Sequence, residues 1–315
     1  MIRTGIVGSE VMCRNYLDSI KGVGELRLVG FFDPDTRLLP HTEAMFEKKL
    51  YEEPDSLLRD VDAVIALSPM SSPQHIETFV RSSKHVLFEP THFFSRTEAN
   101  NLMNMIEEAD VKVQPSFDKR YNMVFGAVKG FIKAPRLIVS NHFTTFKTNA
   151  QVSVLMDVLL HDIDLVLSLV NSEIKSVSAT AVSIDRSQPD VINARIEFNN
   201  KCVAQFNAGR IATESKNEIH FYQNSAYVFA DLQNHQAFLA KKAGNLSDVG
   251  LFTTRKGDLL CDPIPIGTQN DTYNSVKAFA SAIVKNTNPE VNVESMMKTF
   301  TVIQNISEKL KIVSH

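Results

Sequence analysis

The sequence has few cysteines, little net charge and no long apolar run. Cys13, Cys202 and Cys261 are odd in number, far apart and outside any C-x-x-C spacing, so we expect reduced thiols rather than a disulfide framework or a zinc site. A formal net charge of -3 provides no basic field for a nucleic-acid backbone and no polybasic run for an anionic membrane. No segment approaches the roughly 18 uninterrupted apolar residues of a membrane-spanning helix, and the N-terminus reads as a strand rather than a signal peptide. We therefore expect a cytoplasmic protein with small-molecule partners, bound to neither nucleic acid nor membrane.

A chain of 315 residues with 43% hydrophobic residues is long enough to fill two cores. In its first part, short apolar runs alternate with segments of helical spacing. The expected strands are 2–8, 26–32, 63–67, 86–88 and 111–115, and the expected helices are 11–20, 74–82 and 97–109. This alternation predicts a Rossmann-type, doubly wound parallel sheet over residues 1–118.

The remaining residues, 119–315, predict an α+β domain with a mostly antiparallel, open-faced sheet. The expected strands are 136–146, 174–184, 191–198, 202–210, 218–222 and 226–231, and the expected helices are 152–170, 272–285 and 293–313. We expect helix 293–313 to return to the first domain. Helix 152–170 should cover one face of the sheet and leave the other free. The apolar positions Val177, Ala179 and Ala181 then need a cover, which predicts a homo-oligomer, a dimer or a tetramer, through that face.

The turn after the first strand only partly matches the G-x-G-x-x-G pattern of dinucleotide-binding proteins. Gly8 is present, but Glu10 and Cys13 occupy the second and third glycine positions, and a carboxylate there opposes a pyrophosphate. Asp33 follows the second strand, where an acid binds the adenosine ribose and favours NAD, whereas Arg37 just beyond it is able to accept the phosphate of NADP. The alternative for Gly8 and Asp33 is a strand-ending turn followed by a helix cap.

A second candidate site lies on the apolar helix 152–170. Asp157, His161 and Asp164 are spaced i, i+4 and i+7 and share one helical face, whereas Asp162 points away from it. A carboxylate beside an imidazole is a general acid/base arrangement. The alternatives are a buried Asp-His pair that ties the helix to the sheet, an N-cap bond to a neighbouring segment and, as a minor hypothesis, a shared metal ion. We expect no metal site.

These features resemble the Gfo/Idh/MocA family of oxidoreductases over nearly the whole chain. The resemblance depends on Gly5 to Gly8, Asp62 to Ile65 leading to Ser68-Pro69 and His75, Lys84 to Glu89, Glu98-Ala99, Arg120 to Asn122, and Asp157 to Asp164. It implies an NAD(P)-dependent oxidoreductase that acts on a hydroxyl or ketone of a sugar, nucleotide sugar or polyol, and the run Asn193 to Phe198 favours nucleotide sugars.

The resemblance also implies roles for individual residues. His161 is the catalytic acid/base, preceded by the acid Asp157, and Arg120 and Asp164 bind substrate. The residues expected to bind the cofactor are Gly8, Ser9, Glu10, Val11, Asp33, Arg37, Ser68, Pro69, His75 and Glu89.

One departure affects the expected chemistry. The family's Glu-Lys-Pro, whose lysine sits at the reacting hydroxyl, is here Glu89-Pro90-Thr91. His92 and Lys119 are nearby candidates to replace the missing ammonium. Because the lysine and two glycines are lost, a second hypothesis stays open: a catalytically degenerate relative that acts as a binding or regulatory subunit.

Overall fold

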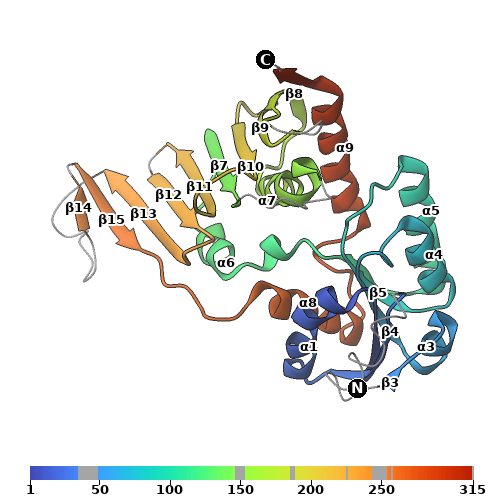
Figure 1. The fold of residues 1–315 in the computed structure, drawn as a ribbon. Coiled ribbons are helices and arrows are strands. Elements are labelled where there is room, and N and C mark those ends of the chain that lie inside the picture. The colour runs from blue at the N-terminus through green and yellow to red at the C-terminus, as the bar shows by residue number, and fades with distance from the viewer. Residues whose placement is uncertain are drawn as a thin grey trace. The chain divides into compact units, whose positions relative to one another are not determined.

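The structure is a computed structural model that describes residues 1–34, 49–145, 153–184, 189–224, 226–242, 254–256 and 258–313 (Figure 1). The chain divides into two compact units. The first comprises Met1–Tyr121 and Gln269–Lys298, and the second comprises Asn122–Thr268 and Thr299–His315. Each unit has its own sheet.

The sheet of the first unit has six strands, all parallel, in the order β3-β2-β1-β4-β5-β6. The strands are β1 (Ile2–Val7), β2 (Leu26–Phe32), β3 (Lys49–Leu50), β4 (Ala63–Ala66), β5 (His85–Phe88) and β6 (Val113–Pro115). All four residues of β4 are buried, as expected for a strand covered on both faces. The strand order reverses between β1 and β4, which is the position where doubly wound sheets bind ligands. The predicted Rossmann architecture is confirmed.

Local sequence signals explain where the helices of the first unit begin. The helices are α1 (Glu10–Gly22), α3 (Pro54–Asp60), α4 (Pro73–Arg81), α5 (Arg96–Ala109), the 3-10 turn η2 (Asp118–Tyr121) and α8 (Asp271–Val284). Ser72 caps α4, which has proline at its first position, and Ser95 and Glu98 form a reciprocal capping box at α5. These caps satisfy backbone N–H groups that no helical carbonyl can reach.

The first unit gains a helix from the end of the chain. Val276, Phe279 and Ala280 of α8 belong to the same buried cluster as Tyr16 and Ile20 of α1. We expected helix 293–313 to return to the first domain, but α8 has this role, and only the start of α9 (Val293–Lys309) belongs to the unit. The apolar face of α8 completes a core that residues 1–118 leave open on one side.

The second unit contains a ten-stranded sheet in the order β14-β15-β13-β12-β11-β7-β10-β9-β8-β16. The strands are β7 (Leu137–Phe143), β8 (Ile174–Val182), β9 (Val191–Phe198), β10 (Val203–Gly209), β11 (Lys216–Gln223), β12 (Ala226–Asp231), β13 (Gln236–Lys242), β14 (Thr254–Lys256), β15 (Leu259–Pro263) and β16 (Leu310–Val313). Among the described strands of this sheet, only the β7·β10 and β8·β16 pairs are parallel, so the predicted, mostly antiparallel α+β fold is confirmed. The end of the expected helix 293–313 is instead the edge strand β16.

One face of this sheet is covered by helices, and none of the described helices lies on the other face (Figure 1). The helices are α6 (Met123–Lys129), the π-helical turn η3 (Leu155–Leu159), α7 (Leu160–Leu169) and the latter part of α9. Val177, Ala179 and Ala181 are buried, so they do not form the face in need of a cover. The alternate residues of β8, such as Ser178 and Thr180, are exposed instead. Cys13 and Cys202 are buried, Cys261 is half-buried, and none of the three forms a disulfide bond.

Candidate functional site

The turn after β1 has the backbone that a dinucleotide needs. Gly8 adopts φ 144°, and a Cβ there would lie 2.8 Å from the carbonyl oxygen of Leu67, so only glycine fits. The N–H of Gly8 donates to the carbonyl of Phe32 at 3.0 Å, and the N–H of Ser9 donates to the carbonyl of Ser68 at 3.1 Å. Ser9 is the N-cap of α1, but its side chain accepts no capping bond. The first turn of α1 therefore begins at the strand-order reversal, where its N–H groups suit a phosphate.

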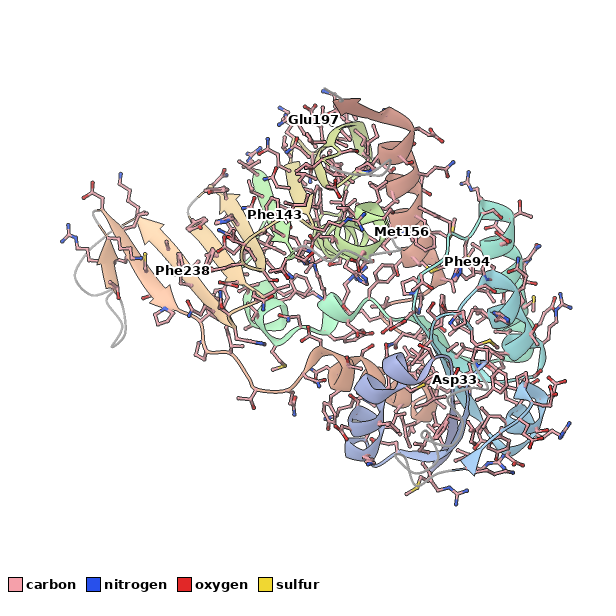
Figure 2. The ribbon with its side chains drawn as sticks, in the orientation of Figure 1. Asp33, Phe94, Phe143, Met156, Glu197 and Phe238 are labelled. Atoms are coloured by element: carbon pink, nitrogen blue, oxygen red, sulfur yellow. The ribbon has the colours of Figure 1, made fainter. Side chains whose placement is uncertain are left out.

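Cys13 occupies the position of the third glycine without disturbing the helix. It is 3% exposed, belongs to the core between α1 and the sheet, and its Sγ lies 3.7 Å from the carbonyl oxygen of Gly8. Asp33, 2% exposed, lies directly after β2 (Figure 2). Glu10 and Val11 begin α1, and their side chains, like the whole of Arg37, lie outside the described part of the chain. Gly8, the start of α1 and the position of Asp33 fit a dinucleotide.

The carboxyl ends of three adjacent strands bring polar side chains together. Ser68 follows β4, Glu89 follows β5 and Ser116 follows β6. The N–H of Ser68 donates to the carboxyl group of Glu89, whereas Glu89 Oε2 is buried without a hydrogen-bond partner. Ser116 Oγ donates a short hydrogen bond to Asp118 Oδ1 and lies 3.0 Å from Tyr16 Oη.

Burial dominates the electrostatics of this edge. It raises the pKa of Glu89 to about 7, and the nearby charge of Asp118 adds to the rise. Burial also raises the pKa of Asp118, although hydrogen bonds from Ser116, Ser275 and Thr272 oppose the change. The pKa of Tyr16 is raised well above its ordinary value by burial and by both carboxylates. Glu89 is thus a carboxyl group that titrates near neutrality, a property common at functional sites.

The other predicted residues of the first unit lie around the same edge. Pro69 follows Ser68 through a cis peptide bond, and His75 on α4 lies with its Nδ1 2.9 Å from Ser72 Oγ. Burial lowers the pKa of His75, which favours the neutral ring. Arg120 lies on η2 and is half-buried. Their roles in binding remain predictions.

Pro90 is buried where the family has its lysine. Beside it, Thr91 Oγ1 lies 2.8 Å from Ser71 Oγ and 3.0 Å from Nδ1 of His92. His92, one of the two candidates for replacing the ammonium, is therefore held by a hydroxyl close to Pro90. Lys119, the other candidate, is on η2.

In the second unit, a π-helical turn changes the predicted helix face. The N–H of Leu160 donates to the carbonyl of Leu155, five residues earlier, and Asp157 lies in this wide turn. Asp157 is exposed, and among the described residues no hydrogen bond joins it to His161, which is half-buried. The i, i+4 spacing thus does not produce the expected pair, because one turn of the helix holds an extra residue. π-helical turns occur frequently at functional sites.

The buried acids of α7 are bound within the unit. Asp162 Oδ2 lies 3.1 Å from Nδ1 of His142 on β7, with side chains 1% and 13% exposed. Thr299 Oγ1 donates to Asp164 Oδ1 at 3.2 Å, and Asp164 is fully buried. A buried Asp-His pair does tie the helix to the sheet, but it uses Asp162 and His142 rather than Asp157 and His161.

Sequence reasoning missed His142, Asp118 and Tyr16. His142 lies in a strand whose alternation predicts an exposed side chain, and Tyr16 reads as an apolar helix residue. Asp118 had one available signal, a carboxylate just beyond the last parallel strand, where ligand-binding residues gather.

No described helix is long and apolar enough to cross a membrane. Among the described residues, no three His, Cys, Asp or Glu side chains gather as a metal site.

A Rossmann unit with a dinucleotide-type turn, joined to an open-sheet α+β unit, defines the class of two-domain NAD-binding oxidoreductases. The family model described as "Oxidoreductase family, NAD-binding Rossmann fold" matches residues 2–117, and the Gfo/Idh/MocA C-terminal domain model matches residues 128–230. The chain belongs to the Gfo/Idh/MocA family of oxidoreductases.

Several characterised proteins are similar to it. UDP-N-acetylglucosamine 3-dehydrogenase of Acidithiobacillus ferrooxidans is 26% identical over 238 residues, which cover 74% of this chain and 75% of that protein. A structure of the same enzyme superposes with a TM-score of 0.89 over 98% of this chain and 97% of its own, at 21% identity. A 3-ketoreductase from Actinomadura kijaniata, in complex with TDP-benzene and NADP, has a TM-score of 0.81 at 17% identity over 99% and 98% of the two chains.

Proposed function

We propose that this protein is an NAD(P)-dependent oxidoreductase that acts on a hydroxyl or ketone group of a sugar, with nucleotide sugars as the favoured substrates. Family membership together with the glycine turn at Gly8 supports the proposal. The names of two relatives point the same way, since one is a UDP-N-acetylglucosamine dehydrogenase and the other a ketoreductase crystallised with a TDP compound.

Different residues of the first unit would bind the different parts of the cofactor. Gly8 and Ser9 would bind the pyrophosphate at the start of α1, Asp33 the adenosine ribose, and Ser68, Pro69, His75 and Glu89 the nicotinamide half. The bound cofactor supplies the acceptor or donor of a hydride. Asp33 favours NAD by repelling a 2′-phosphate, and Arg37 opposes this preference.

His161 would exchange the proton of the reacting hydroxyl, and Arg120 would bind the substrate. Asp157 would orient His161, which requires its exposed side chain to turn toward the ring when substrate binds. Asp164 is fully buried and accepts a hydrogen bond from Thr299, so we propose that it stabilises the position of this helix and does not contact the sugar.

The test is cofactor binding followed by turnover. Calorimetric titration with NADH and NADPH should give saturable binding. A panel of nucleotide sugars, sugars and polyols should then reveal turnover as a change in the absorbance of the reduced nicotinamide at 340 nm. His161→Ala should reduce turnover by about two to four powers of ten with cofactor affinity nearly unchanged. His235→Ala, in an exposed turn, is the matched control. Undiminished turnover in His161→Ala would refute its role.

A second candidate is a catalytically degenerate subunit that binds or regulates. The buried Pro90 in place of the family's lysine favours it, because proline offers neither charge nor donor to a developing oxyanion. In that case the chain would bind a sugar ligand with no turnover, whatever cofactor is supplied. Absence of saturable cofactor binding at millimolar concentration would favour this candidate over the oxidoreductase.

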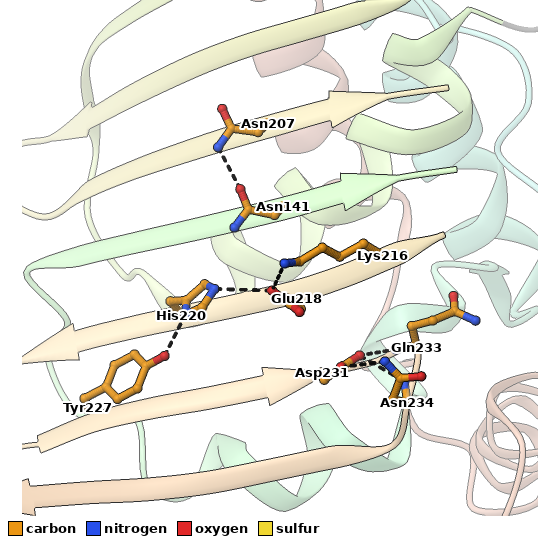
Figure 3. A network of polar contacts seen from close by, with 9 residues as sticks. All are labelled: Asn141, Asn207, Lys216, Glu218, His220, Tyr227, Asp231, Gln233 and Asn234. Atoms are coloured by element: carbon orange, nitrogen blue, oxygen red, sulfur yellow. Dashed lines mark hydrogen bonds and ion pairs between the residues drawn. The ribbon is translucent and has the colours of Figure 1, made fainter. Parts of the chain in front are cut away.

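We also propose that the protein is a homo-oligomer through the uncovered face of the second sheet. This face carries stacked aromatic rings of His220, Tyr222, Tyr227, Phe229 and Phe238. His220 Nδ1 lies 2.7 Å from Tyr227 Oη. Figure 3 shows this hydrogen bond and the ion pair of Lys216 with Glu218, with Asn141 and Asn207 alongside. A light-scattering mass of one chain at micromolar concentration would contradict the proposal.

A further inference from the structure

Two carboxyl groups at the carboxyl edge of the parallel sheet act on each other. Glu89 follows β5, and Asp118 begins η2 shortly after the adjacent strand β6. The charge of Asp118 acts on Glu89, and both charges act on Tyr16 of α1. In the proposed function Glu89 contacts the cofactor. Neither the proton of Glu89 nor the side chain of Asp118 has a role there.

The two carboxyl groups have unequal hydrogen-bond partners. Asp118 accepts hydrogen bonds from the hydroxyl groups of Ser116, Thr272 and Ser275. Glu89 accepts one, from the N–H of Ser68, and its Oε2 is buried without a partner. Donors stabilise the charged form of a carboxyl group, whereas a buried oxygen without a donor favours the protonated form. Asp118 therefore carries the charge, and Glu89 holds the proton.

The hydroxyl network agrees with this assignment. When Asp118 is ionised, Ser116 donates its one proton to Asp118, and the hydroxyl of Tyr16 then donates to Ser116. The chain of donors thus runs from Tyr16 through Ser116 to Asp118 and ends on a charged acceptor. Gln114 holds Ser275 in place, with Nε2 3.1 Å from its carbonyl oxygen and 3.3 Å from its Oγ.

The charges that most affect the pair are negative. Asp118 acts on Glu89, and Asp271 at the start of α8 acts on Asp118. Tyr16 from α1 is a neutral donor, and Ser68 contributes a backbone N–H from the segment after β4. The start of α8, which places Thr272 and Ser275 against Asp118, favours a carboxylate there by its N-terminal dipole. A second negative charge on Glu89 lacks such support.

We propose that Glu89 and Asp118 form a proton-holding pair that selects between the oxidised and reduced forms of the nicotinamide cofactor. The inference rests on the proposed function. The oxidised nicotinamide ring carries a positive charge and the reduced ring is neutral, so the doubly ionised pair attracts the oxidised form and leaves the reduced form nearly unaffected. Binding of the oxidised cofactor should therefore ionise Glu89 and release its proton to solvent. By linkage, the affinity for the oxidised cofactor should then rise as the pH rises.

The test compares the dissociation constants of NAD⁺ and NADH, and of the NADP pair, on the full chain between pH 6 and pH 8.5. In the wild type, preference for the oxidised form should rise with pH, by about tenfold for each pKa unit by which the bound cationic ring lowers the pKa of Glu89. Glu89→Gln should bind both forms at a ratio that does not change with pH. Asp118→Asn should move the change to lower pH, because the charge that opposes ionisation of Glu89 is gone.

Glu108→Gln, which removes an exposed carboxylate from α5 of the same unit, should behave as the wild type. Calorimetry in two buffers of different ionisation enthalpy measures the proton released, which should accompany the oxidised form only and vanish in Glu89→Gln. If both forms bind but the wild-type ratio does not change with pH, the pair has no such role and the proposed function stands. If neither form binds at millimolar concentration, the proposed function fails and this inference fails with it.

Discussion

The protonation of Glu89 predicts how the stability of the first unit depends on pH. A rise in its pKa from 4.5 to about 7 means that, between these values, the folded state holds a proton that the unfolded state has lost. The free energy of unfolding should therefore fall as the pH rises through this window. At about 1.4 kcal/mol per pKa unit, the loss by pH 8 is about 3 kcal/mol.

Glu89→Gln should remove this loss, because the amide resembles the protonated acid and cannot ionise. The variant should match the wild type near pH 5 and exceed its unfolding free energy by up to about 3 kcal/mol at pH 8. Urea unfolding followed by far-UV circular dichroism suits a chain without tryptophan, with separate transitions fitted if the two units unfold apart. Glu108→Gln is the control. A difference between Glu89→Gln and wild type that stays constant from pH 5 to pH 8.5 would refute the reasoning.

Two further substitutions test other parts of the structure. Gly8→Ala should lower the unfolding free energy by about 1–3 kcal/mol and abolish cofactor binding, because a φ of 144° is strained for any side chain and a Cβ would meet Leu67. Thermal melting measures the loss of stability and calorimetry the loss of binding. An unchanged melting temperature would contradict the strained backbone at this turn. His142→Ala should cost about 1–3 kcal/mol because it removes the ring that the buried carboxyl of Asp162 contacts at 3.1 Å. Asp157→Ala, at an exposed position, should cost under about 0.5 kcal/mol. Equal urea midpoints for the two variants would contradict the assigned pairing.

The alternation of strands and helices in the first unit was predictable because each element carries its own local signal. Apolar runs such as 63–67 end at Ser68-Pro69, and the helix from Arg96 begins with a serine cap and a glutamate three residues later. Parallel connections are short and right-handed, so these local signals restrict the sheet to a few strand orders. The site residues after β1 and β2 follow from the same reasoning, because ligands bind where the strand order reverses.

Contacts between distant segments could not be predicted in this way. The phase of the helix at Asp157 depends on one extra residue in a π-helical turn, which the 3.6-residue period does not reveal, and the partner of Asp162 is a histidine on a strand 20 residues earlier. The face of β8 that is buried was also decided by packing, since Val177 and its apolar neighbours were free to lie on either side.

The sequence by itself thus determined the two architectures and the position of the nucleotide turn, because hydrophobic period, caps and glycine act within a few residues. Only the tertiary structure decided that α8 completes the first core and that Thr272 and Ser275 meet Asp118, 154 residues or more before them in the chain. The protonation of Glu89 was decided there too. A pKa depends on burial and on neighbouring charges, and both arise only when segments far apart in sequence fold together.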